Sequence, residues 1–188
     1  MFGELAKKLN NKQVLLKTLA PQHYEELRTA CAEDREIWDI YPNSMLGDHF
    51  DKAIADLAAA QDRVVFAVIK LSPNNAEQKV VGMTSYINPD EQGVVEIGGT
   101  YIRPGVRGSN FNLTMKRLLI EHAFNCGYRR IEFRVDVRNK RSQRAVLKLG
   151  AKQDGILRKN KVTWTGHIRD TAVFSIFEDE WQATHGAG

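Results

Sequence analysis

Long apolar runs, clustered cysteines and low-complexity tracts are all missing from this chain of 188 residues. The longest purely apolar run covers only residues 64–69, whereas a helix that crosses a bilayer needs about 20 such residues. The first residues also lack the apolar segment of a secretory signal. We therefore expect a cytoplasmic protein with no membrane partner.

Patterns for metal binding and for disulfides are missing too. The two cysteines, Cys31 and Cys126, lie far apart, no Cys-x-x-Cys occurs, and the five histidines show no ligand spacing. These absences predict that no metal is bound and that both thiols are free, as in a reducing compartment. No Gly-x-Ser-x-Gly and no Cys/His arrangement marks a covalent nucleophile, so any group transfer is expected to be direct.

The charge is distributed unevenly along the chain. Hydrophobic residues make up 43% of it and charged residues 27%, as in an ordinary globular domain. The net charge is +4, but residues 103–161 hold 16 Lys and Arg against 4 Asp and Glu, while the rest holds 11 against 19. Such a basic block can bind nucleic acid, bind a small polyanion or simply be solvated. The aromatic residues with basic neighbours, Phe124 and Phe133, sit at core positions, which argues against nucleic acid.

Hydrophobic periodicity predicts one domain at 13–182, preceded by an extension at 1–12 with a short, loosely attached helix, and followed by a disordered tail at 183–188. Strands are expected at 13–19, 64–71, 80–88, 94–102, 130–137, 153–159 and 168–177. Helices are expected at 21–33, 49–61, 112–126 and 141–149, with a turn at 72–75 and an irregular segment at 36–42. The apolar face of the helix at 112–126 is expected to carry Met115, Leu118, Leu119, His122 and Cys126.

The order of these elements indicates the fold class. The three strands between 64 and 102 are joined by short turns, which predicts an antiparallel meander, and the strand–helix–strand unit at 94–137 predicts one parallel crossover. We expect a mixed α/β fold of α+β type with a mostly antiparallel sheet, because a Rossmann fold would alternate strand and helix throughout.

A loop of small residues joins the strand at 94–102 to the helix at 112–126. Gly108 and Ser109 let a ligand approach the backbone, while Arg103 and Arg107 add positive charge beside the free N–H groups of the first helical turn. A pyrophosphate needs these features, although a plain loop with Asn112 as the helix N-cap would also explain the residues. The usual glycine patterns of nucleotide-binding loops are absent.

This loop and its surroundings resemble the GNAT N-acetyltransferases, and most of all their RimJ/RimL branch of ribosomal-protein N-terminal acetyltransferases. The resemblance covers about residues 13–182 and rests on the segments at 96–98, 101–104, 107–112, 135–145, 149–151, 155–158, 169–171 and 174–176. Asn110 replaces the usual glycine of the loop, and we expect the loop shape to survive because Asn tolerates positive φ. Asn112 replaces a glycine or alanine, and Gly99 stands where relatives often carry a large aromatic residue.

The resemblance implies a GNAT fold in which the parallel neighbours, the strands ending at Ile102 and Val137, splay apart to hold acetyl-CoA. The basic block would then match the phosphates of CoA. The residues that it assigns to acetyl-CoA are Tyr101, Ile102, Arg103, Arg107, Gly108, Ser109, Asn110, Phe111, Asn112, Asn139 and Arg144. A backbone N–H near residues 101–103 would polarise the thioester carbonyl.

Three side chains are candidates for the chemistry. Glu96 lies in an otherwise apolar strand and would act as the general base, directly or through a water, if it faces the wedge; an outward, solvated carboxylate is the alternative. Asn139 would hold the pantetheine amide or the acceptor, or else cap the next helix. Ser142 would protonate the departing thiolate, or else be a core hydroxyl. Trp38 and Tyr41 would form a wall of the acceptor site, or else pack in the core.

The implied function is direct transfer of an acetyl group from acetyl-CoA to a primary amine, with a peptide or protein N-terminus favoured. An α-amine titrates at about 8, so deprotonating it at pH 7 costs about 1 kcal/mol, against about 4.6 kcal/mol for a lysine. Residues 1–102 hold 10 Lys and Arg against 15 Asp and Glu, which predicts acidic surroundings for the amine. The alternatives are acetylation of a polyamine, amino acid or amine antibiotic, and a non-catalytic acyl-CoA sensor. A homodimer is common among such relatives.

Overall fold

The structure is a computed structural model that describes residues 2–72 and 78–185. One sheet holds the strands in the order β1-β2-β3-β4-β5-β6-β8-β7. The strands are β1 (Leu9–Asn10), β2 (Val14–Thr18), β3 (Arg63–Leu71), β4 (Gln78–Ile87), β5 (Val94–Ile102), β6 (Arg130–Asp136), β7 (Lys152–Val162) and β8 (Ile168–Phe177). The helices are α1 (Phe2–Leu5), α2 (Tyr24–Ala32), α3 (His49–Ala59), α4 (Phe111–Asn125), α5 (Lys140–Leu147) and α6 (Glu178–His185), with 3₁₀ turns η1 (Pro21–His23), η2 (Glu36–Ile40) and η3 (Pro104–Val106).

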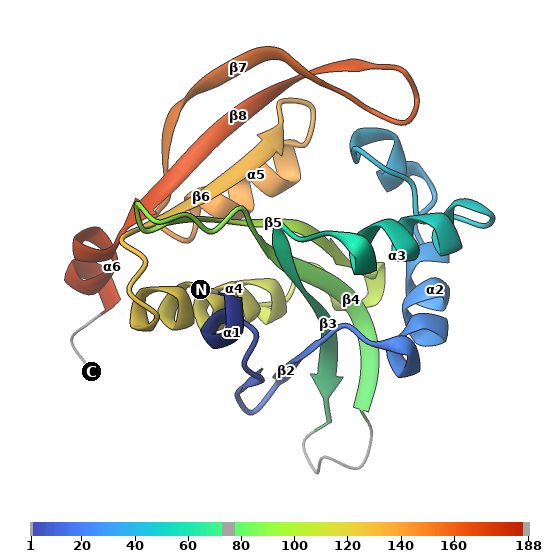
Figure 1. Ribbon diagram of the computed structural model, residues 1–188, viewed down its shortest axis with the longest axis horizontal. Helices are drawn as coiled ribbons and strands as arrows, with labels where there is room; N and C mark the ends of the chain where they lie inside the picture. The colour runs from blue at the N-terminus through green and yellow to red at the C-terminus, as the bar shows by residue number, and fades with distance from the viewer. Residues whose placement is uncertain (1, 73–77, 186–188) are drawn as a thin grey trace.

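The predicted mixed sheet is confirmed. Neighbouring strands pair antiparallel throughout, except for β5 and β6, which α4 connects as a parallel crossover. In Figure 1 the β7–β8 hairpin arches over β6 and α5, and α4 lies on the other side of β5. Within the described ranges, no helix is both long enough and apolar enough to cross a membrane.

Several local predictions differ from the structure. The N-terminal helix is not loosely attached, because Leu5 is fully buried and β1 pairs with β2. The predicted helix at 21–33 is divided into η1 and α2, and the irregular segment after it is the 3₁₀ turn η2. Neither β1 nor α6 was expected, since both are too short to show periodicity, and residues 183–185, which were assigned to a disordered tail, form the end of α6. The turn predicted at 72–75 lies outside the described residues apart from Ser72, as does the tail from 186 onward.

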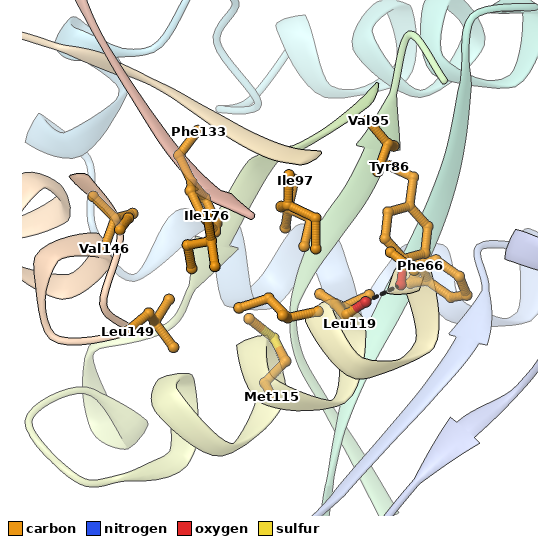
Figure 2. Packing of buried hydrophobic residues seen from close by; sticks show 14 of the residues in the cluster. Phe66, Tyr86, Val95, Ile97, Met115, Leu119, Phe133, Val146, Leu149 and Ile176 are labelled. Carbon is orange, nitrogen blue, oxygen red and sulfur yellow. Dashed lines mark hydrogen bonds between the residues drawn. The ribbon is translucent and has the colours of Figure 1, made fainter. Parts of the chain in front are cut away.

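Helices cover both faces of the sheet, and each face has its own apolar core. On one face, α1, α4, α5 and α6 pack on the strands; Figure 2 shows Met115 and Leu119 of α4 beneath Ile97 and Phe133. Tyr86 closes this core by donating a hydrogen bond to the Leu119 carbonyl over 2.6 Å. On the other face, α2, η2 and α3 cover the strands β2 to β5.

The regular pairing of strand β5 with its neighbours is interrupted at two places. Against β4 it bulges, because Gly99 and Thr100 together oppose the single residue Thr84, and Gly99 adopts the positive φ of 58° that this turn of the backbone requires. Against β6 its pairing stops at Glu96, although β5 continues to Ile102 and β6 to Asp136. The sheet is therefore open between the second halves of β5 and β6.

Gly82 of β4 allows the two strands to approach each other beside this bulge. A Cβ at Gly82 would lie 1.9 Å from the Tyr101 carbonyl oxygen, which is a backbone atom that cannot rotate away. We expect Gly82→Ala to lower the free energy of unfolding by at least about 2 kcal/mol, measured by urea denaturation.

The matched control is Gly155→Ala in β7, where nothing lies within 4 Å of an added Cβ. We expect that variant to stay within about 0.5 kcal/mol of the wild type. Equal effects of the two substitutions would contradict the close approach at Gly82.

Candidate active site

The opening between β5 and β6 is lined by backbone groups of β5. The Arg103 N–H donates to the Val81 carbonyl of β4 over 2.8 Å. Because backbone groups alternate in direction along a strand, the N–H and carbonyl groups of Thr100 and Ile102 point the other way, toward β6. The backbone donors that could face a thioester are therefore those of Thr100 and Ile102, and the Arg103 N–H is already used.

The loop after β5 carries the positive φ at Gly108, where it is 76°, and not at Asn110, where φ is −72°. Asn110 occupies the N-cap position of α4, so neither the expected positive φ at Asn110 nor the alternative cap at Asn112 is correct. The Ser109 hydroxyl donates to the Val106 carbonyl over 2.9 Å and accepts from the Phe111 N–H over 3.3 Å.

This loop leaves backbone donors without acceptors. Among the described residues, no partner is found for the N–H groups of Gly108, Ser109, Asn110, Asn112 and Leu113. The Phe111 side chain is 5% exposed and packs in the core, so only its backbone belongs to the loop surface. Consecutive free N–H groups at a helix N-terminus attract anionic oxygens, and this loop fits a phosphate group for that reason.

The sequence suggested that Arg103 and Arg107 extend freely from this loop. In the structure they do not. The Arg103 guanidinium pairs with Glu33, donating from Nε over 2.9 Å, and the Arg107 guanidinium pairs with Asp34. Arg107 Nε also donates to the Ile102 carbonyl over 2.6 Å. Both arginines therefore attach the loop to the end of α2, and their charges are largely neutralised by carboxylates in this structure.

Two aromatic residues predicted for the site lie in the core. Trp38 is fully buried, its ring stacks on Tyr101 at 4.9 Å, and its indole N–H donates to the Cys31 carbonyl over 3.0 Å. It cannot touch a substrate. The Tyr101 side chain is likewise fully buried and donates to the Ala30 carbonyl over 2.6 Å, so it is closed to a ligand.

Tyr41 differs from Trp38 because it is partly exposed and lies beside the opening. Its hydroxyl donates to the Thr100 carbonyl, one of the backbone groups that face the gap. Burial raises the pKa of Tyr41 to about 12, so the hydroxyl keeps its proton at neutral pH. Tyr41 thus connects η2 to the edge of the opening.

Glu96 is the last residue of β5 that pairs with β6, and it is not a solvated carboxylate. Its side chain is 16% exposed and lies 3.8 Å from Arg134. It lies on the sheet face opposite α4, because its neighbours Val95 and Ile97 both pack in the core on the α4 side. Burial raises the pKa of Glu96, and the nearby Arg134 and Lys161 oppose this shift.

The surroundings of Glu96 are basic, contrary to the expectation from the charge of residues 1–102. Arg134, Lys161 and Arg169 all act on its carboxylate. Arg169 is 7% exposed and donates from Nε to the Thr171 hydroxyl over 2.9 Å. Counting charges along the sequence failed here because Arg134 of β6 and Lys161 of β7 belong to the basic block, and Arg169 of β8 follows it, yet all three lie close enough to act on Glu96 of β5.

The remaining predicted residues lie on or beside α5. The Asn139 side chain accepts a hydrogen bond from the Ser142 N–H over 3.0 Å and caps the helix, so the alternative role foreseen for Asn139 is confirmed. Ser142 is partly buried, and Arg144 is exposed. None of the three contacts the loop at 107–112 in the described structure.

Lys116 is a residue of this region that sequence reasoning missed. The buried face of α4 consists of Phe111, Met115, Lys116, Leu119, Ile120, Ala123 and Phe124. The predicted face was rotated, since Leu118, His122 and Cys126 are only partly buried. A lysine at helical spacing with Leu119, Ile120 and Ala123 was the signal that could have revealed it.

Comparison with known proteins agrees with this geometry. The family model described as an acetyltransferase (GNAT) domain matches residues 13–152. A GCN5-related N-acetyltransferase from Brucella melitensis has 28% sequence identity and a TM-score of 0.87, covering 97% of this chain and 83% of the other. No curated protein matches the sequence.

Two more distant structures share the fold. Mycobacterium smegmatis RimJ, in complex with CoA-disulfide, is 15% identical with a TM-score of 0.77, covering 97% of this chain and 96% of its own. Spermidine N-acetyltransferase from Vibrio cholerae, in complex with CoA and spermine, is 16% identical with a TM-score of 0.71. The match covers 91% of this chain and 99% of the other.

An open sheet with one parallel crossover, whose loop before the connecting helix leaves backbone N–H groups free, is the architecture of an acyltransferase of the GNAT type. The chain belongs to the GNAT acetyltransferase family, and it is an acetyltransferase.

The raised pKa of Glu96 predicts how the stability of the fold changes with pH. A carboxyl with a higher pKa in the folded than in the unfolded state favours folding below its unfolded pKa, and this advantage is lost as the pH rises through its folded pKa. We expect Glu96→Gln, which removes the ionisable group, to gain thermal stability relative to the wild type as the pH rises from 4 to 8. Thermal melts of both proteins across this range measure the difference, and a constant difference would contradict the burial of a charged Glu96.

Proposed function

We propose that this acetyltransferase uses acetyl-CoA and transfers the acetyl group directly to a primary amine, with the N-terminal α-amine of a peptide or protein as the acceptor, as in the RimJ/RimL branch. The observation that carries the proposal is that β5, open toward β6 beyond Glu96, leads directly into the loop before α4, where five backbone N–H groups between 108 and 113 have no partner. The loop would hold the pyrophosphate, and the pantetheine arm would lie between the strands and hydrogen-bond the exposed backbone of β5.

Under this proposal, the backbone of β5 and the Glu96 side chain have different roles near the thioester. At the thioester, the N–H of Thr100 or Ile102 would donate to the carbonyl oxygen and stabilise the developing negative charge. Glu96 would accept a proton from the attacking amine, directly or through a water. Its raised pKa makes it a stronger base than an ordinary carboxylate.

The basic surroundings of Glu96 bear on the choice of acceptor. Arg134, Lys161 and Arg169 would repel a molecule with several positive charges, although the spermidine enzyme of the same fold binds spermine. A single α-amine enters such surroundings more easily than a polyamine, and at neutral pH it is also easier to deprotonate. RimJ, whose structure holds a CoA-disulfide, provides the fold-level parallel.

The phosphate-binding role of the loop predicts the effect of charge at Gly108. Asp and Asn have nearly the same shape, and both tolerate the positive φ of 76° at this position. We expect Gly108→Asp to weaken acetyl-CoA binding more than tenfold, or about 1.4 kcal/mol, because it places a carboxylate beside the phosphates. Gly108→Asn is the matched control and should bind several times more tightly than Gly108→Asp in calorimetry. Equal affinities of the two variants would place the phosphates elsewhere.

The acceptor is tested by thiol release from acetyl-CoA with a panel of amines. We expect peptides with free N-termini to be acetylated and spermidine to react poorly. With the best acceptor, we expect Glu96→Gln to lower kcat about 10²-fold with acetyl-CoA affinity unchanged. Efficient acetylation of a polyamine or an aminoglycoside alone would overturn the peptide acceptor. Binding of acetyl-CoA without thiol release for any amine would identify the protein as an acyl-CoA sensor.

A further inference from the structure

A lysine lies in the apolar core beneath the opening of the sheet. Lys116 is 5% exposed, although the free energy of burying an ammonium is unfavourable unless a partner compensates for the lost water. Within the described ranges no carboxylate forms an ion pair with its Nζ. The hydrogen-bond partners of Nζ are the hydroxyl groups of Thr100, at 2.6 Å, and Thr84, at 3.4 Å.

The contacts of Lys116 bridge the two strands that part. Thr100 belongs to β5, beyond the last residue that pairs with β6, while the Phe133 ring of β6 lies with its centroid 5.9 Å from Nζ. Phe133 directly follows Glu132, the last residue of β6 that pairs with β5. Figure 2 places Phe133 and Ile97 on either side of this gap, above α4. Nζ therefore lies on the α4 side of the opening, against Thr100 and within reach of the Phe133 ring.

Packing alone does not account for the ammonium. The hydroxyl groups of Thr84 and Thr100 already bond to each other over 2.8 Å, so they do not need a third donor to be satisfied. A methionine of similar length would fill the same volume without the cost of burying a charge.

The orientation of acetyl-CoA under the proposed function brings its reactive end to this lysine. The phosphate-binding loop lies at the wide end of the opening, after Ile102, so the pantetheine arm must extend from there toward the narrow end. The thioester is at the far end of this arm. It would therefore lie beside Thr100, whose backbone faces the opening, with Glu96 on one face of the sheet and Lys116 on the other.

We propose that Lys116 is a further catalytic residue, whose Nζ hydrogen-bonds the thioester end of acetyl-CoA and protonates the leaving sulfur. This inference rests on the proposed function. The amine nitrogen forms a bond to the carbonyl carbon, the carbon–sulfur bond breaks, and its electron pair goes to sulfur, which takes a proton from the Lys116 ammonium. The amine loses its proton to Glu96 or to a water, and Lys116 regains a proton from solvent, so the products are an acetylated amine and free CoA thiol.

The electrostatic surroundings of Lys116 suit a proton donor. The groups that face it are Thr84 from β4, Thr100 from β5 and Phe133 from β6, and the charge of Glu96 acts on it from the other face of the sheet. Burial lowers the pKa of Lys116 to about 7, and the charge of Glu96 acts in the opposite direction. Transfer is most efficient when the pKa of the donor is close to the working pH.

Ser142 is the competing donor, since the family resemblance assigns it the same proton. It approaches from α5, whereas Lys116 approaches from α4, so the two can be tested separately. Ser142→Ala removes a hydroxyl, and Lys116→Met removes the ammonium while keeping the length of the side chain.

The test compares Lys116→Met with Arg117→Met, which removes an exposed positive charge from the neighbouring position on α4. We expect Lys116→Met to lower kcat about 10²-fold with an unchanged KM for acetyl-CoA, and to melt at the wild-type temperature or above it. Arg117→Met should retain wild-type kcat. A kcat of Lys116→Met within about twofold of the wild type, or a loss of kcat confined to Ser142→Ala, would overturn the proposal.

The pH profile separates a proton donor from a structural lysine. We expect the wild-type kcat to fall at high pH as Lys116 loses its proton, Lys116→Met to lack this fall, and Lys116→Arg to restore part of kcat with the fall moved to higher pH. The same fall in Lys116→Met would overturn the proposal. A wild-type protein that binds acetyl-CoA but releases no thiol with any amine would overturn the proposed function as well, whereas an active wild type with an unaffected Lys116→Met would overturn this inference alone.

Discussion

The interrupted ladder between β5 and β6 is the constraint on which the rest of the structure depends. Backbone groups that leave a sheet must find other partners, and here two side chains supply them. The Tyr41 hydroxyl donates to the Thr100 carbonyl and Arg107 Nε to the Ile102 carbonyl. Both carbonyls are thereby satisfied while the N–H groups beside them stay available. The opening is thus a stable feature of the fold that keeps donors free for a ligand.

The two sides of this opening carry different chemistry. On the face covered by α2 and the β7–β8 hairpin, Glu96 lies near Arg134, Lys161 and Arg169 as well as Glu132, and its raised pKa reflects burial only partly compensated by the cations. On the α4 face, Lys116 is surrounded by apolar side chains and two hydroxyl groups. A carboxylate that holds a proton more strongly than usual and an ammonium that holds one less strongly than usual therefore lie on opposite sides of the same gap. Under the proposed function, these are the two groups that would exchange protons with the reactants.

Much of the fold could be predicted from the sequence, because alternation and helical spacing are local properties. The meander of β3 to β5, the crossover through α4 and the loop before α4 all follow from patterns within about 15 residues. Short elements such as β1 and α6 were missed, since their pairing and packing depend on distant residues. The rotation of the buried face of α4 was missed for a related reason: a lysine is not counted toward an apolar face, although the strands above Lys116 accept its side chain.

The sequence by itself determined that the chain forms a mixed sheet with one crossover, that a glycine-containing loop enters a helix, and that Glu96 interrupts an apolar strand. Only the tertiary structure decided which of these groups are free to act. Arg103 and Arg107 look available in the sequence but are paired with Glu33 and Asp34 of another segment, and Trp38 is enclosed by Tyr101. The basic environment of Glu96 and the burial of Lys116 likewise come from strands distant in sequence. Charge and burial are set by neighbours in space, which sequence spacing alone does not reveal.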